Sequence, residues 1–485
     1  MKNGHDIQRI SVGSRIAEQE IEGLKSYFIK TPLWEDILDN EVDIIFGCKG
    51  SGKSAIYGYL STLEYDLMSD NVLLTLAENP RGTIAFKDLA VTPPVNEFEF
   101  KCIWKLYFVI LIYQKLFDFN YSDLSFKEVT EKLQDSDLIP RSTSFTSIIK
   151  LVRGYIKRVN PIIEPNVSLN EYSGAVEKIG LKVSMLEPCT KMADKGIVSV
   201  DYLLSLLNSS LLNKKEFLWI TIDRLDAIFQ EDFELEATAL RTLFQVYIDL
   251  QVFTNIRLII FLRDDIWNRI IEHGFRETSH ITKTDTITWN QQTLFTLIMS
   301  RFEQNEGLIH SLKLEKLDNI LERREELFRR IFPINKAENS GSTFDWLIAK
   351  IKDGNNVATP RELIQLITTA IKFETKELQS GKINSESLLS FDSLIEGLKD
   401  ASKTKLETLI AEYPGLKHFV YLLKKRKVHF EIDELKQIWN IGRKEAIIIS
   451  DNLMKVGFFN KIEEESIAHF YIPIIFRPAL GIQII

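Results

Sequence analysis

Short, continuous apolar runs alternate along this chain with longer segments in which apolar residues recur every three or four positions. The runs are rich in β-branched and aromatic residues, which favours strands buried on both faces, as in a parallel sheet. They lie at residues 42–46, 71–76, 216–222 and 256–262. The helical patterns between them, at 53–66, 97–158 and 198–212, supply the crossovers that parallel strands need. The pattern therefore predicts an α/β fold with a parallel sheet.

The first apolar run leads into a glycine-rich turn. Gly47, Gly52, Lys53 and Ser54 match the P-loop pattern G-x-x-x-x-G-K-[ST], placed after a strand and before a helix. Glycines let the turn direct successive backbone N–H groups at a phosphate, and the helix N-terminus adds partial positive charge. Lys53 would contact the β- and γ-phosphates, and the Ser54 hydroxyl would bind Mg²⁺. We therefore predict a nucleotide site with contacts from Gly47, Cys48, Lys49, Gly50, Ser51, Gly52, Lys53, Ser54 and Ala55.

A later strand-length run ends in an acid, Asp223, which fits the Walker B pattern. At the carboxyl end of a central parallel strand, this carboxylate would face the ligand crevice and help to hold Mg²⁺. Many ATPases place a water-activating acid at the next position, where this chain has Arg224. Asp226 is the next carboxylate, and it either orients the attacking water or caps the following helix. We therefore expect ATP hydrolysis to be slow or conditional.

Two arginines are candidates for contact with the γ-phosphate. Arg263 follows the run 256–262, so it either points into the same crevice or pairs with a neighbouring aspartate. Arg361 follows Thr359 and Pro360, which mark the start of a helix. On a helical lid it would bind the γ-phosphate through two hydrogen bonds; otherwise it is a surface arginine. The candidate catalytic residues are thus Lys53, Asp223, Asp226 and Arg263.

Composition and charge limit the number of domains, the binding partners and the cellular compartment that we expect. A length of 485 residues predicts two to four domains, and a net charge of −8 gives no general attraction to nucleic acid or anionic membranes. Three widely separated cysteines, at 48, 102 and 189, fit a reducing compartment. The most apolar run, 104–119, contains charged residues and is too short to span a bilayer. We therefore expect a cytoplasmic protein without a membrane segment.

The last part of the chain predicts a winged helix. Three helical patterns between 415 and 456 are followed by a strand pattern at 468–472. Lys424, Lys425 and Arg426 make this part locally basic, so it could grip duplex DNA; such a domain is also a common protein-docking module.

The whole chain can then be divided into predicted parts. These are an N-terminal helical segment at 1–40 packing on the core, a P-loop ATPase core at 41–305 with a mainly helical insertion at about 97–195, a helical lid at 306–381, a linker at 382–402 and the winged helix at 403–485.

Taken together, the motifs resemble those of bacterial STAND/AAA+-type P-loop ATPases, and more narrowly an uncharacterised group encoded in prokaryotic defence islands. The resemblance rests on the P-loop, Asp-Arg-Leu-Asp at 223–226, Arg-Asp-Asp at 263–265, Trp-Asn at 289–290, Pro-Arg-Glu-Leu at 360–363 and the winged helix. It implies an ASCE-type nucleotide domain, a lid and a winged helix in the order of origin-recognition ATPases, with Arg263 and Arg361 as sensors. Two departures are Arg224 and the lack of a separate effector or sensor-repeat domain.

We therefore expect an ATP- and Mg²⁺-binding molecular switch that assembles or remodels a protein complex, in antiphage defence by the resemblance. It would act with a partner protein encoded nearby or as a homo-oligomer. One alternative is a DNA-binding ATPase of the initiator or loader class acting through the winged helix. Another is a scaffold that binds ATP without hydrolysing it, for which Arg224 is the motivation.

Overall fold

The computed structural model describes most of the chain, in two compact units. The described residues are 10–77, 97–139, 147, 150–155, 199–223, 225, 233–272, 274–334, 342–381, 387–464 and 467–483. The sheet unit comprises Pro32–Cys48 and Ile56–Thr286, and the helical unit comprises residues up to Thr31, Lys49–Ala55 and Ile287–Ile485.

The sheet unit is built on five parallel strands in the order β2-β3-β4-β1-β5. The strands are β1 (Ile44–Phe46), β2 (Val72–Leu76), β3 (Phe217–Ile222), β4 (Ile256–Leu262) and β5 (Thr284–Thr286). Strand β4 lies between β1, which enters the P-loop, and β3, which ends at Asp223. This insertion is the arrangement of ASCE-type P-loop proteins, and the predicted α/β fold is confirmed. Strand β5 is not among the predicted strands, because its three residues, Thr-Asp-Thr, lack an apolar pattern.

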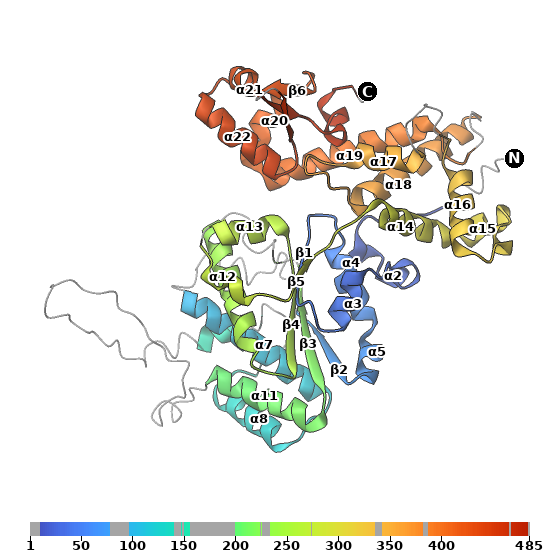
Figure 1. Ribbon diagram of the computed structural model, residues 1–485. Helices are drawn as coiled ribbons and strands as arrows, with labels where there is room; N and C mark the ends of the chain where they lie inside the picture. Colours follow the sequence, from blue (N-terminus) through green and yellow to red (C-terminus); the bar gives the residue numbers. More distant parts are fainter. Residues whose placement is uncertain are drawn as a thin grey trace. The chain divides into compact units, whose positions relative to one another are not determined.

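Helices cover both faces of this sheet (Figure 1). Every residue of β1 and β4 is buried, as expected for strands between two helical layers. The covering helices are α3 (Pro32–Leu38), α4 (Lys53–Thr62), α5 (Glu64–Ser69), α7 (Glu97–Asp118), α8 (Leu124–Asp135), α11 (Val200–Lys214), α12 (Phe233–Leu250) and α13 (Asp264–Glu272).

Helix α7 is the most apolar segment, and it is a buried helix as predicted. Its one fully buried cation, Lys105, lies between two acids: its ammonium is 2.7 Å from Asp201 on α11 and 2.7 Å from Asp249 on α12. Burial lowers the pKa of Lys105, but the hydrogen bonds to the two aspartates outweigh it and leave the pKa raised. Among the described residues, no helix has the length and apolar character needed to cross a membrane.

A buried ion pair fixes β1, the strand that carries the P-loop, against β4. The Arg257 guanidinium donates to Asp43 at 2.6 Å and to the carbonyls of Ile37 and Val42 at 2.8 and 2.6 Å. Tyr247 donates to the other Asp43 oxygen at 3.0 Å. Both charges lie inside apolar strand patterns, and each is satisfied by the other.

The helical unit is organised around two long helices, α18 (Pro360–Gln379) and α19 (Phe391–Glu412), which pack along each other. Residues 391–402, predicted as part of a linker, instead form the first half of α19. Their Lys, Asp and Glu residues lie on the more exposed face of an amphipathic helix, whose buried stripe includes Leu394, Leu398 and Ala401 together with the two serines. The other helices of this part are α2 (Ile21–Tyr27), α14 (Gln291–Glu303), α15 (Glu306–Ser311), α16 (Ile320–Ile331) and α17 (Thr343–Ile351).

The N-terminal segment belongs to this unit. Ile10 and Val12 enter the core formed by α14 to α19, and Arg301 on α14 donates to the Val12 carbonyl at 2.7 Å. Arg301 also pairs with Glu20 at 3.0 Å. The N-terminal segment is therefore held to the helical unit by contacts with α14.

The C-terminal part is a winged helix, as predicted. It consists of α20 (Lys417–Tyr421), β6 (His429–Glu431), α21 (Ile432–Trp439), α22 (Arg443–Lys455), β7 (Asn460–Glu464) and β8 (Ile467–Tyr471). The three strands form an antiparallel sheet in the order β6-β8-β7. Strand β6 was not predicted; it is only three residues long and buries only Phe430.

Candidate nucleotide-binding site

The glycine-rich turn joins β1 to α4, as the P-loop pattern predicts. Gly50 and Gly52 have φ angles of 88° and 107°, a backbone conformation that side chains with a Cβ rarely adopt. Lys53 and Ser54 are the first two residues of α4, where backbone N–H groups have no intrahelical acceptor. The turn therefore has the local geometry that binds phosphate in P-loop proteins. Binding by Gly47 to Ala55 stays a prediction.

Ser51 gives the turn a further polar group suited to an anion. Its side chain is buried, at 1% exposure, and its hydroxyl has no hydrogen-bond partner among the described residues. Its carbonyl accepts a hydrogen bond from the Trp289 indole at 2.7 Å. An unsatisfied buried hydroxyl costs free energy, so a phosphate oxygen at this turn would supply the missing partner.

The lid arginine lies beside the turn, within the helical unit. A Cβ added to Gly50 would lie 2.9 Å from both Arg361 Cβ and Thr359 Oγ1, so only glycine allows this approach. Pro360 is the first residue of α18, as predicted. The Thr359 side chain does not cap the helix, however; its hydroxyl donates to the Glu362 carboxylate instead. The structure thus brings Arg361 next to the P-loop turn.

In the sheet unit, Asp223 and Arg263 leave the sheet at the same edge. They follow β3 and β4, which are adjacent parallel strands with Ile222 opposite Ile260. Asp223 is buried, at 5% exposure. Arg263 donates two hydrogen bonds to the carboxylate of Asp265, at 2.9 and 2.8 Å. The alternative in which Arg263 pairs with a neighbouring aspartate is therefore realised, and its contact with the γ-phosphate stays a prediction.

Two residues that bear on catalysis, Arg224 and Asp226, lie outside the described residues, as does Cys189. The alternatives for Asp226 therefore stay open. Among the residues that the structure describes, no group of three or more His, Cys, Asp or Glu side chains is arranged to hold a metal ion. A magnesium ion bound mainly by phosphate, one hydroxyl and one carboxylate does not need such a group.

Tyr57 is a residue near Asp223 that the sequence analysis missed. It lies on α4, three positions after Ser54, and its hydroxyl donates to the Ala77 carbonyl at the end of β2, at 3.0 Å. Its ring meets Phe261 of β4 edge-on, with centroids 6.1 Å apart. Burial, and next the charge of Asp223, raise the pKa of the Tyr57 phenol. The spacing from Ser54 along α4 is the signal that could have found it.

Two contacts of the turn with distant residues were also missed. The indole of Trp289 donates to Ser51, as described above, and Lys49 forms an ion pair with Glu412 at the end of α19. Trp289 was singled out only as part of a Trp-Asn pair, and no sequence signal pointed to Glu412.

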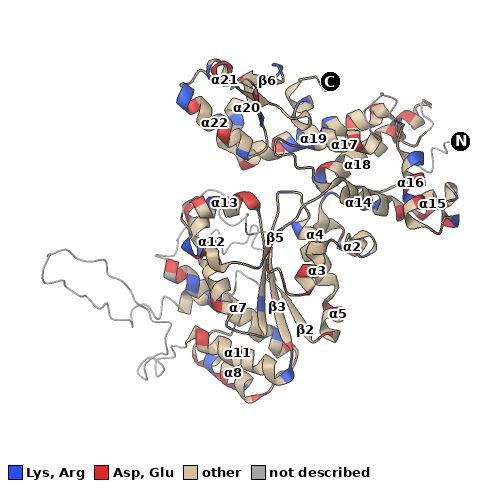
Figure 2. Ribbon diagram, in the orientation of Figure 1, with Lys and Arg blue, Asp and Glu red and all other residues tan. Residues whose placement is uncertain are grey.

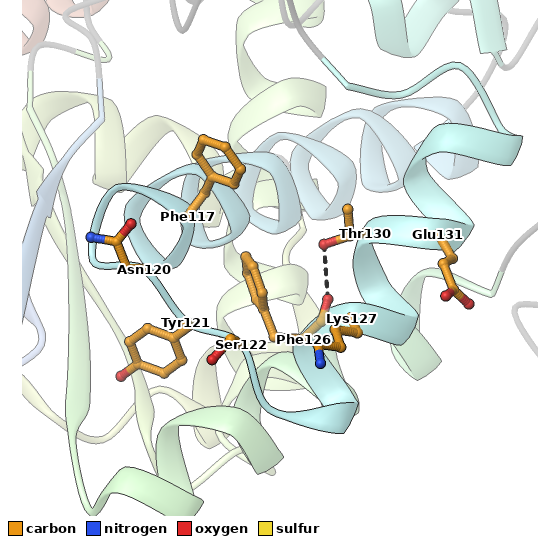
Figure 3. Close-up of a pocket in the computed structure, with 8 residues that line it drawn as sticks. All are labelled: Phe117, Asn120, Tyr121, Ser122, Phe126, Lys127, Thr130 and Glu131. Carbon is orange, nitrogen blue, oxygen red and sulfur yellow. Dashed lines mark hydrogen bonds between the residues drawn. The ribbon is translucent and has the colours of Figure 1, made fainter.

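A pocket of about 430 Å³ lies elsewhere in the sheet unit, where α7 ends and α8 begins (Figure 3). Its lining residue Tyr121 donates to Glu216, which precedes β3, whereas Asp223 follows the same strand. Six strand residues, or about 20 Å, separate these two edges of the sheet. The pocket is therefore distinct from the edge that carries Asp223.

Comparison with known proteins gives only distant likenesses. No protein-family profile matches the chain, and no curated protein sequence matches it. The chain is similar in fold to the ORC1 protein of Aeropyrum pernix in complex with DNA, with 9% identity, a TM-score of 0.35, and 97% of this chain and 94% of that chain covered. For the ORC2 protein of the same organism, in ADPNP and ADP complexes, identity is 12%, the TM-score 0.31 and coverage 96% and 91%.

Proposed function

We propose that this chain is an ATP-binding P-loop ATPase of the initiator or loader kind, in which nucleotide controls a winged helix that contacts duplex DNA. The observation that carries the proposal is the approach of α18 to the P-loop turn. Arg361 lies against Gly50, and the same compact unit contains the winged helix. A ligand in the turn would therefore act directly on the element that leads, through α19, to the winged helix.

In this proposal, different residues bind the phosphates, the metal ion and the γ-phosphate. Backbone N–H groups of the turn and Lys53 would hold the phosphates. Ser54 and Asp223 would hold Mg²⁺, which neutralises charge between the β- and γ-phosphates when bound. Arg361 would bind the γ-phosphate from the lid, so ATP and ADP would bind the lid differently.

Hydrolysis in this proposal is conditional. Arg263 is paired with Asp265, whose negative charge would weaken the stabilisation that this arginine gives to charge on the γ-phosphate while the pair persists. Asp226 would orient the attacking water, in the absence of an acid at position 224. We expect slow turnover that a partner or DNA accelerates.

The charge of the winged helix supports contact with DNA. Residues 413–485 contain eleven Lys and Arg against eight Asp and Glu, although the whole chain has a net charge of −8. Lys424, Lys425 and Arg426 are exposed one after another in the turn between α20 and β6. Three adjacent cations of this kind would contact phosphates without reading sequence.

ATP binding tests the first half of the proposal. Lys53→Ala and Asp223→Ala should each weaken Mg²⁺–ATP binding by about tenfold or more, because each removes a charge-assisted contact worth about 1.5–3 kcal/mol. Lys25→Ala, at an exposed position of α2, is the matched control and should bind like the wild type. Wild-type protein that does not bind ATP, or equal binding by all three variants, would contradict the proposal.

Salt-dependent DNA binding tests the second half. Neutralising Lys424, Lys425 and Arg426 together should weaken duplex binding with ATP present and lower the slope of log affinity against log salt by roughly 2–3. The matched control neutralises three exposed lysines on α18 and α19, namely Lys376, Lys399 and Lys403. Absence of DNA binding at low salt would remove this half and leave ATP binding standing.

A second candidate, a switch that assembles a protein complex, is favoured by the surface of α22. Ile447 and Ile448 are exposed there, at 42% and 60%, and Figure 2 shows acidic as well as basic positions along α21 and α22. Acidic side chains such as Asp451 repel DNA phosphates, whereas adjacent exposed apolar side chains are typical of protein contacts. Under this candidate, Ile448→Lys abolishes a partner's co-purification and spares ATP binding. The predicted role in antiphage defence stays a prediction.

A further inference from the structure

Three consecutive residues of the P-loop turn contact three different elements of the helical unit. The Ser51 carbonyl accepts from the Trp289 indole just before α14, at 2.7 Å. Gly50 lies against Thr359 and Arg361 at the start of α18. Lys49 forms an ion pair with Glu412, the last residue of α19. Only the third of these contacts is between two opposite charges, so it is the one that a charged ligand would change most.

Glu412 stands at a junction of the chain. Helix α19 ends there; Tyr413 leaves the helical conformation, with φ −126° and ψ 68°. A short 3-10 turn, Pro414–Leu416, follows and leads directly into α20 of the winged helix. The Glu412 side chain is 18% exposed and that of Lys49 is 40% exposed, so water screens the pair only in part.

A nucleotide would alter this ion pair because of its charge. Phosphates held by the backbone of the turn would lie close to residue 49, where they attract the Lys49 ammonium and repel the Glu412 carboxylate. Glu412 and the phosphates thus compete for one cation. By thermodynamic linkage, if nucleotide binding destabilises the ion pair by a given factor, the ion pair lowers the affinity for the nucleotide by the same factor.

We propose that Glu412 is a positioning residue that holds Lys49 when no nucleotide is in the turn, and that nucleotide binding releases it and loosens the junction between α19 and α20. This inference rests on the proposed function, since it requires that the turn binds ATP. It identifies the junction at 412–417 as the place where the nucleotide acts on the winged helix.

The test compares Glu412→Gln with the wild type and with Glu407→Gln. Glu407 lies on the same helix, is 64% exposed and faces Lys403, so its variant makes the same change of charge away from the P-loop turn. Two quantities are measured on the full chain with Mg²⁺–ATP as the ligand: the dissociation constant and the amide hydrogen exchange of residues 410–421.

In the wild type and in Glu407→Gln, ATP should speed exchange at 410–421. In Glu412→Gln, exchange should be fast without ATP, ATP should change it little, and ATP should bind about fivefold more tightly. Glu412→Lys, which repels Lys49, should show both effects more strongly. A gain in affinity separates this role from a merely structural one, because damage to the fold would weaken ATP binding.

Unchanged affinity and an unchanged response of exchange to ATP in Glu412→Gln, or a loss of affinity in both Glu412 variants, would overturn the inference. Failure of the proposed function looks different, because the wild type itself would then not bind ATP, and the inference would fall with it.

Discussion

Cys48 and Cys102 are both partly exposed, but they lie in different elements. Cys48 is the second residue of the P-loop turn and is partly exposed. Cys102 lies on α7, where burial raises the pKa of its thiol to about 12, an effect that the charge of Lys105 only partly offsets. Since the thiolate is the reactive form, about one Cys102 in ten thousand would be reactive at pH 8.

We therefore predict that iodoacetamide at pH 8 modifies Cys48 and spares Cys102. Mg²⁺–ATP at ten times its dissociation constant should slow modification of Cys48 by about tenfold, because only unoccupied protein reacts. Peptide mass spectrometry after timed labelling measures both rates. In Lys53→Ala, the same ATP concentration should slow modification by no more than about twofold, because ATP binds this variant at least about tenfold more weakly. Equal labelling rates for the two cysteines would contradict the first expectation. An equal labelling rate for Cys48 with and without ATP would contradict the second.

The buried pair of Asp43 and Arg257 is the second prediction at this scale. Breaking it with Arg257→Met leaves the Asp43 carboxylate buried without its cation, which should cost about 3–5 kcal/mol of folding free energy. The double variant Asp43→Leu with Arg257→Met should cost less than the single one, because no charge is left buried. Calorimetric unfolding midpoints compare the three proteins. A double variant less stable than Arg257→Met would show that the pair does more than satisfy its own charges.

At the scale of elements, the packing of α18 on α19 depends on the absence of one side chain. A Cβ at Gly397 would lie 2.2 Å from the backbone oxygen of Leu366, which cannot move aside as a flexible side chain can. Gly397→Ala should therefore lower the folding free energy by about 1–3 kcal/mol, as overpacking does in cores. Gly415→Ala is the matched control, because nothing lies within 4 Å of the added methyl group. Equal unfolding midpoints for the two variants would contradict this account.

Sequence patterns predicted elements well where the elements are long or doubly buried. The apolar runs that became β1 to β4 are buried on both faces, so nearly every position had to be apolar. The pattern failed for β5 and β6, which have three residues each, and for the first half of α19. In each of these cases the backbone is held by neighbouring elements, which a local pattern does not record.

At the scale of the whole molecule, a ligand that binds only the folded protein must stabilise it. Mg²⁺–ATP at 100 times its dissociation constant should add about 2.7 kcal/mol to the free energy of unfolding. Calorimetry should show the rise in midpoint for the wild type and at most about half of it for Lys53→Ala, because ATP binds this variant at least about tenfold more weakly. The same rise in both proteins would place the stabilising site outside the P-loop.

The sequence by itself determined the glycine-rich turn, the α/β class and the winged helix. Each of these depends on local requirements, such as glycine at positive φ in the turn, apolar residues in buried strands and helical periodicity. Tertiary structure decided which side chains meet the turn. Trp289 and Ser51 are 238 positions apart, and Lys49 and Glu412 are 363 apart. It also decided that Arg263 pairs with Asp265. The physical reason is that partners are selected by how distant elements pack, and a charge in the sequence carries no record of the charge it will face.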